Sequence, residues 1–529
     1  MAKRNRAVLR KRAREILTAV VMLFAWLSHP ATTMAQPRES LGLEPGAYPV
    51  GFRLFAEQDH SRSVAANKGT ATYPRPIRVY VWYPAVAAGT PMPFGRYAVL
   101  ADEDVWPAEM SDGARDVLRF SRGPLARSLE PSAFEALLKR PMRAAENASP
   151  APGRFPLIAI GQGLYYESPI AFAALAEFLA GRGLVVVSVP LVGTASPLVR
   201  IDAEDLETQV RDLEFAIARA RQLPFVSGDR LGVLGFDMGG MAGLLLTMRN
   251  REVDAFASLD SGIFYPHPSG LPQASPSYNT AALRVPWLHA APLRPGERPP
   301  DSKVKSLFDT ATASNRYLLV TSGMEHVDFT SYALIDGRRA MPNYWGDPLP
   351  DAAHRQGIVA DYVAHFFAAF LRDDAAGVAW LARDPADAFP GAQMTLGHRA
   401  ATPASIGYDE LVQDIVSGRA EAAIARLRAS DRLEERPRAL DQAHLDRLAV
   451  SVLYTWGLAE HALPLLRYLA ERYPDSVQAQ SMLTDGYVQL GDYVSAIGAL
   501  SKFVDQHPDR PGARARLEQL RAFQSTPRK

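Results

Sequence analysis

The chain of 529 residues contains no cysteine. This absence excludes a disulfide framework and metal–thiolate sites, and it also excludes anchoring through a lipid-modified N-terminal cysteine. Stability must therefore come from a hydrophobic core. Hydrophobic residues make up 47% of the sequence, which is enough material for one large domain and a smaller one.

The N-terminus lacks an apolar run long enough to cross a membrane comfortably. Its apolar segment, Ile16 to Leu27, has twelve residues and follows seven basic residues, whereas a spanning helix needs about twenty. Thr33 and Ala35 are small enough for cleavage after Ala35. We therefore predict a signal peptide over 1–35 and an exported protein, periplasmic or secreted, with no stable membrane anchor after cleavage. An uncleaved anchor is the alternative.

Positive charge is not in excess beyond this leader. Removing its seven basic residues and one acidic residue changes the formal charge from +1 to −5, which gives no electrostatic basis for binding nucleic acid. Glycine-rich phosphate loops are absent, and no spacing of histidines and carboxylates is typical of a metal site. We therefore expect no cofactor, no metal and no nucleic-acid partner.

The body of the chain, over 36–395, is predicted to be an α/β domain. Short continuous apolar segments alternate with helical patterns, which is typical of a mainly parallel sheet with helices on both faces. These segments are 155–164, 183–190, 230–235, 253–260, 285–290 and 316–323. Residues 85–150, rich in proline, alanine and charge, predict irregular structure with short helices and a candidate cap. Residues 396–405 are predicted to be a linker.

The remainder, 406–529, is helical in pattern and repeats itself. Gly457, Ala462 and Pro474 recur 34 residues later as Gly491, Ala496 and Pro508, and this is the period of a two-helix repeat. The second copy resembles the tetratricopeptide repeat. That resemblance implies stacked helical hairpins, and it leads to the hypothesis that a protein or peptide partner binds their outer surface.

The segment Gly235-Phe236-Asp237-Met238-Gly239 lies between an apolar strand pattern and a helical pattern. Glycines on both sides allow a strand-to-helix turn so tight that side chains there would clash, and the residue at its tip is held in a strained backbone conformation. This is the pattern of a nucleophile elbow. Asp237 stands at the tip.

Three further segments match in the right order: 155–164, 253–260 and 323–332. With the elbow, they give the chain from about 45 to 371 a definite resemblance to α/β-hydrolases of the dienelactone hydrolase and platelet-activating-factor acetylhydrolase type. In that family the elbow carries serine, so Asp237 is a departure. The resemblance implies that Asp260 orients a base, His326, and that the backbone N–H groups of Leu164 and Met238 form the oxyanion hole. It also implies a small-molecule substrate.

Three roles remain open for Asp237. In the first, Asp237 is a carboxylate nucleophile that attacks a saturated carbon, as in the related dehalogenases and epoxide hydrolases, although those enzymes usually place tryptophan where Met238 stands. In the second, it supports ester or acyl hydrolysis without serine, as nucleophile or as base towards water. In the third, it holds the turn of a catalytically silent site, because aspartate tolerates unusual backbone regions.

The leading hypothesis is an exported α/β-hydrolase that acts on an ester or a similar small substrate with an Asp237–His326–Asp260 constellation. One alternative is a catalytically silent scaffold that binds a protein partner through its helical repeats. The other is an enzyme like a dehalogenase or an epoxide hydrolase, with Asp237 as nucleophile.

Overall fold

A computed structural model describes residues 41–65, 72–102, 128–164, 168–196, 198–292, 305–336, 351–391, 393–402, 406–430 and 440–525. The predicted signal peptide, 1–35, lies outside these residues. Within them, no helix combines the length and the apolarity needed to cross a bilayer.

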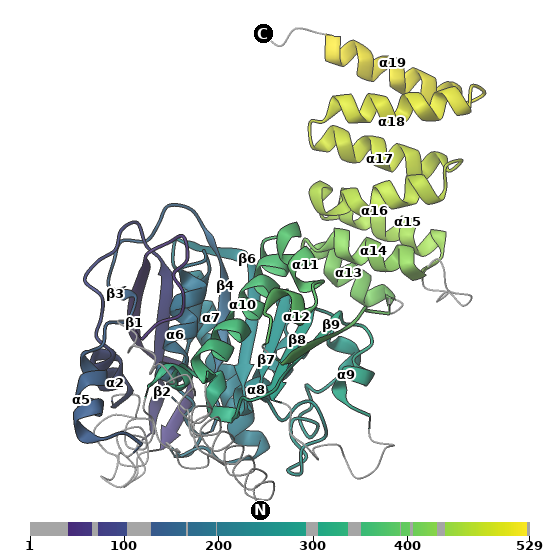
Figure 1. Cartoon of the computed structure of the whole chain (residues 1–529). Coiled ribbons are helices and arrows are strands. Elements are labelled where there is room, and N and C mark those ends of the chain that lie inside the picture. The colour runs from purple at the N-terminus through teal and green to yellow at the C-terminus, as the bar shows by residue number, and fades with distance from the viewer. Residues whose placement is uncertain are drawn as a thin grey trace, which may run out of the picture.

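A ten-stranded sheet forms the centre of the α/β region (Figure 1). Its spatial order is β10-β9-β8-β7-β6-β4-β5-β2-β1-β3. The neighbours from β5 to β9 are parallel, while β2 runs antiparallel to β5 and to β1. The strands are β1 (Val50–Ala65), β2 (Thr72–Pro84), β3 (Ala144–Glu146), β4 (Phe155–Gly161), β5 (Val185–Ser188), β6 (Val226–Phe236), β7 (Ala255–Leu259), β8 (Trp287–Pro292), β9 (Arg316–Thr321) and β10 (Met394–Arg399).

This order, with the crossover that places β4 between β5 and β6, is that of the α/β-hydrolase fold. The predicted fold class is confirmed: a mainly parallel sheet with helices on both faces, followed by an all-helical region. Each of the six apolar segments contains residues of one strand of this sheet.

Helices cover both faces of the sheet because the strands are apolar on both. In β4, Leu157 belongs to one core cluster and Ile158 to the other, as expected when successive side chains point to opposite faces. The clusters pack against two different pairs of helices. One pair is α6 (Ala173–Ala180) and α10 (Ala352–Leu371), and the other is α7 (Ala203–Arg221) and α8 (Met238–Arg249).

The described parts of the predicted cap, 85–150, contain the short helices α2 (Phe94–Asp102) and α5 (Pro131–Lys139). Strand β3 also belongs to this segment and pairs with β1 at the edge of the sheet. Shorter helices elsewhere in the α/β region are α9 (Leu307–Thr310), α11 (Ala375–Leu381), α12 (Pro385–Ala388) and the 3₁₀ turns η2 (Pro169–Phe172), η3 (Thr280–Ala282), η4 (His326–Phe329) and η5 (Ser331–Leu334).

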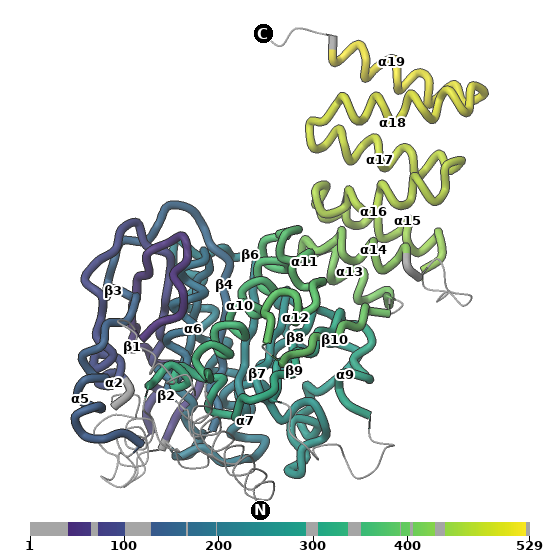
Figure 2. Tube along the Cα trace, viewed as in Figure 1, coloured from purple at the N-terminus to yellow at the C-terminus, as the bar shows by residue number. Residues whose placement is uncertain are grey.

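The predicted linker, 396–405, begins too early. Residues 394–399 form β10, which pairs antiparallel with β9 and extends the sheet to Arg399; Figure 2 shows β10 beside β9. The pattern misled because β10 is an edge strand whose residues are mostly exposed, so it lacks the apolar run by which the central strands are recognised.

The C-terminal region is a stack of helical hairpins that extends away from the sheet (Figure 1). Its elements are α13 (Tyr408–Val416), α14 (Ala420–Ser430), α15 (Gln442–Val450), the π-helical turn η7 (Ser451–Thr455), α16 (Ala459–Arg472), α17 (Val477–Gln489), α18 (Tyr493–Gln506) and α19 (Pro511–Ser525). Gly457 and Gly491, which the 34-residue period pairs, have φ values of 67° and 74°. The two copies therefore share the same left-handed turn between helices, which glycine adopts without strain.

Helix α13 docks the stack onto the α/β region through charged side chains. Glu410 forms an ion pair with Arg284, and Asp414 lies 3.7 Å from Arg251. Arg251 and Arg284 precede β7 and β8 in the chain, so they lie near the amino ends of the parallel strands. The helical stack is therefore attached at the side of the α/β region opposite to the carboxyl ends of these strands.

Candidate active site

The sharp turn between β6 and α8 places Asp237 at the carboxyl edge of the sheet. Its φ of 49° and ψ of −119° are sterically unfavourable for any residue with a side chain. The neighbouring glycines are required: a Cβ on Gly235 would lie 2.2 Å from the carbonyl oxygen of Gly239, and one on Gly239 would lie 2.2 Å from that of Gly161. The Ser261 hydroxyl steadies the turn by donating a 2.6 Å hydrogen bond to the Asp237 carbonyl.

The carboxylate of Asp237 faces the loop after β4. Leu164 N–H donates a 2.9 Å hydrogen bond to Asp237 Oδ2. Close approach of the loop depends on Gly163, because a Cβ there would lie 2.7 Å from the Cβ of Asp237. Of the two predicted oxyanion donors, Leu164 is thus turned to Asp237. Met238 begins α8, and the Asp237 side chain accepts no capping hydrogen bond from the first turn of that helix.

Asp260 and His326 meet at the same edge. Asp260 directly follows β7 and has a φ of 36°, and His326 begins η4 after β9. The distance between His326 Nδ1 and Asp260 Oδ2 is 2.7 Å. With the proton on Nδ1 donated to the carboxylate, Nε2 is left as the acceptor that a general base needs. The structure therefore brings together this predicted pair from strand ends 66 residues apart.

The imidazole of His326 also lies beside the elbow. It stacks on the ring of Phe236, with 4.4 Å between ring centroids, and Phe236 immediately precedes Asp237. The side chain of His326 is 30% exposed, whereas that of Asp260 is 7% exposed. The imidazole is thus accessible to a small molecule or water, while its carboxylate partner is shielded.

A second histidine close to this pair was not singled out from the sequence. His289 on β8 is buried, and its Nδ1 lies 2.8 Å from the Ser258 hydroxyl. Trp287 Nε1–H donates to the same hydroxyl. Burial lowers the pKa of His289 to about 4, against a smaller opposing effect of the nearby Asp260 charge. A neutral imidazole therefore lies behind the orienting carboxylate.

Nothing in the described part of the chain gathers three or more histidine, aspartate or glutamate side chains that could hold a metal ion. The groups that meet at the site are a carboxylate at the elbow, a backbone N–H that donates to this carboxylate, and a histidine whose Nδ1 lies against the carboxylate of Asp260.

Comparisons with known proteins add little to this geometry. No family model matches the sequence, and the search of curated proteins finds no match. Among solved structures, a ferulic acid esterase from Streptomyces cinnamoneus is similar, with 23% sequence identity, coverage of 66% of this chain and 93% of that chain, and a TM-score of 0.45. The fold assignment rests on the strand order.

Proposed function

We propose that this protein is a hydrolase of small molecules in which Asp237 attacks a saturated carbon that carries a leaving group. The observation that carries the proposal is the hydrogen bond from Leu164 N–H to Asp237 Oδ2. It favours this function over the hydrolysis of an external ester, which was the leading hypothesis from the sequence.

An external ester needs the oxyanion hole for its own carbonyl oxygen, because that oxygen becomes negatively charged when the acyl carbon is attacked. Here a carboxylate oxygen of the protein is hydrogen-bonded to the Leu164 donor. An acyl substrate would have to displace this oxygen before reacting. The position of Asp237 Oδ2 therefore works against acyl transfer.

Attack on a saturated carbon has no such conflict. The free oxygen of Asp237, Oδ1, forms a bond to the carbon while the bond to the leaving group breaks, which gives an alkyl ester of Asp237 and releases the leaving group with its electron pair. The carbonyl oxygen of this ester is Oδ2, and Leu164 already binds it. The protein itself thus presents an ester carbonyl in the oxyanion hole.

Hydrolysis of that ester then uses His326 and Asp260. Nε2 of His326 removes a proton from water, the resulting hydroxide bonds to Cγ of Asp237, and Oδ2 becomes the oxyanion. The bond from Cγ to the alkoxy oxygen breaks, and the alcohol leaves after taking up the proton. Asp260 stabilises the imidazolium that exists between these steps. The sum is R–X + H₂O → R–OH + HX, and for an epoxide the product is a diol.

The test is a single turnover in H₂¹⁸O with haloacids, epoxides and short-chain activated esters as substrates. In the proposed pathway the water oxygen enters Asp237 in the first turnover, so peptide mass analysis finds ¹⁸O in Asp237 and none in the alcohol. Direct attack by water on the substrate labels the product instead and refutes the nucleophilic role. Both haloacids and epoxides are needed, because Met238 replaces the tryptophan that usually supports halide release.

Two variants sharpen the experiment. His326→Gln keeps the nucleophile but removes the base, so the alkyl ester should persist and add the mass of the alkyl group to the intact protein. Asp237→Asn should form no adduct. If wild-type protein turns over no substrate and Asp237→Ser gains esterase activity, the site lacks only the serine nucleophile. This outcome would favour the catalytically silent scaffold. Export and a protein partner for the helical stack stay predictions from the sequence.

A further inference from the structure

Two buried glutamines lie behind the oxyanion loop. Gln209 on α7 donates a 2.8 Å hydrogen bond from Nε2 to the backbone carbonyl of Gln162. Gln162 in turn donates from its own Nε2 to the Ser188 hydroxyl at 2.6 Å, and that hydroxyl donates to the carbonyl of Ile160. Gln162 and Gln209 are 0% and 1% exposed, so water cannot replace these bonds easily.

The carbonyl that Gln209 holds fixes the direction of the loop. Because a peptide unit is planar, orienting the Gln162 carbonyl also orients the N–H of Gly163, one residue before the N–H that binds Asp237. The first turn of α8 presses on the same carbonyl, since a Cβ on Gly239 would lie 2.6 Å from the Gln162 oxygen. The loop is therefore held between α7 and the elbow.

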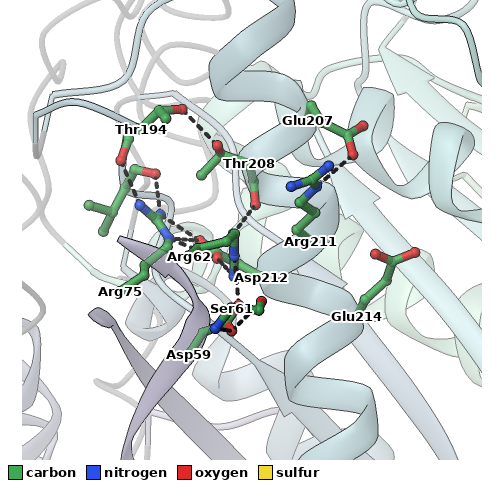
Figure 3. A network of polar contacts seen from close by, with 12 residues as sticks. Asp59, Ser61, Arg62, Arg75, Thr194, Glu207, Thr208, Arg211, Asp212 and Glu214 are labelled. Carbon is green, nitrogen blue, oxygen red and sulfur yellow. Dashed lines mark hydrogen bonds and ion pairs between the residues drawn. The ribbon is translucent and has the colours of Figure 1, made fainter. Parts of the chain in front are cut away.

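Helix α7 is itself held by charged side chains, which Figure 3 shows around Asp212. Asp212, three residues after Gln209, accepts hydrogen bonds from Arg75 of β2 at both of its carboxylate oxygens, and Arg62 of β1 lies 2.6 Å from Oδ1. Arg75 also donates to the carbonyls of Val192 and Gly193. Such a doubly paired carboxylate fixes the helix against the sheet.

Asp205, four residues before Gln209, extends this anchoring to the loop after β5. It accepts hydrogen bonds from the backbone N–H groups of Thr194 and Arg200. Gln209 is thus presented to the oxyanion loop from a helix that is fixed on both sides of it, which is how a precise site is supported by its surroundings.

We propose that Gln209 is a positioning residue, whose side chain holds the Gln162–Gly163 peptide so that Leu164 N–H points at Asp237 Oδ2. The inference rests on the function proposed above. It matters more for the second chemical step than for the first, because Oδ2 acquires its full negative charge only when water attacks the ester of Asp237. Loss of the Gln209 hydrogen bond should therefore slow ester hydrolysis more than ester formation.

Gln209→Met tests this because methionine keeps the length of the side chain and removes the donor. We expect ester hydrolysis to fall on the order of 10- to 100-fold, the usual effect of a misplaced catalytic group, and the alkylated protein to accumulate in the steady state. The matched control is Thr208→Val, the adjacent position on α7, whose hydroxyl contacts Thr194 rather than the oxyanion loop. Thr208→Val should change neither the rate of ester hydrolysis nor the amount of alkylated protein by more than about twofold.

A second variant guards against misfolding of the first. Glutamate at 209 can donate to the Gln162 carbonyl only when it is protonated, so the turnover of Gln209→Glu relative to wild type should rise as the pH falls. The positioning role is overturned if Gln209→Met slows ester formation and ester hydrolysis equally, or if the turnover of Gln209→Glu relative to wild type does not change with pH. In either case an adduct in wild type and His326→Gln still upholds the proposed function. Absence of any adduct in those two proteins overturns both.

Discussion

A buried carboxyl group makes the stability of the α/β region depend on pH in an unusual direction. Glu177 of α6 is 1% exposed. It accepts hydrogen bonds from the Tyr97 hydroxyl at 2.9 Å and from the Arg143 backbone N–H at 2.8 Å. Burial raises the pKa of Glu177 from 4.5 to about 7, and these hydrogen bonds only partly oppose the effect.

The sign follows from proton binding. Between pH 4.5 and 7 the folded state keeps the proton on Glu177, whereas the unfolded state releases it. The stabilisation is therefore complete below the unfolded pKa and is lost as the pH rises through the folded pKa. At about 1.4 kcal/mol per pKa unit, the shift corresponds to a loss of about 3 kcal/mol in the free energy of unfolding between pH 4 and pH 8.

Glu177→Gln isolates this contribution, because the amide has similar shape and stays neutral at every pH. Urea unfolding of both proteins should be followed by tryptophan fluorescence, since Trp82 Nε1–H donates to the Tyr97 hydroxyl of the same network. The stability of wild type relative to Glu177→Gln should fall by about 3 kcal/mol from pH 4 to pH 8, mostly above pH 5. Parallel stability curves across this range would refute the reasoning.

Three further predictions concern the site and the docking of the helical stack. Gly163→Ala should leave the fold intact but lower kcat/KM by at least tenfold in a steady-state assay, because its Cβ would lie 2.7 Å from that of Asp237; unchanged kinetics would contradict the close approach. In NMR titrations His289 should stay neutral from pH 8 down to pH 5, as its pKa of about 4 requires, and a midpoint near 6.5 would show that it is not buried. Glu410→Gln should remove the partner of Arg284 and increase protease cleavage around residues 400–407, and an unchanged digestion pattern would show that this ion pair does not secure the docking.

The sequence predicts the architecture well because the features that decide it are local. Each central strand contains a short apolar segment. The elbow is marked by Gly235 and Gly239, where a Cβ would lie only 2.2 Å from a backbone oxygen. Strand β10 escaped prediction because an exposed edge strand carries no comparable signal. Gln209 and His289 escaped for a different reason. Gln209 and His289 bind partners that lie 47 and 31 residues away along the chain. No local sequence pattern around either residue predicts such a contact.

The choice among the roles of Asp237 also depended on a distance that no pattern contains. Serine and aspartate at an elbow need the same glycines, the same strand and the same helix, so acyl hydrolysis, attack on a saturated carbon and a silent turn are all compatible with the motif. The side chains differ in what they bring to the oxyanion hole. A serine contributes one attacking oxygen and leaves the hole for the carbonyl of the substrate. A carboxylate contributes two oxygens, and one of them accepts a 2.9 Å hydrogen bond from Leu164 N. In the proposed function the other oxygen is the attacking atom, so the ester that is hydrolysed is the one formed on Asp237 itself, and the substrate must donate an alkyl group.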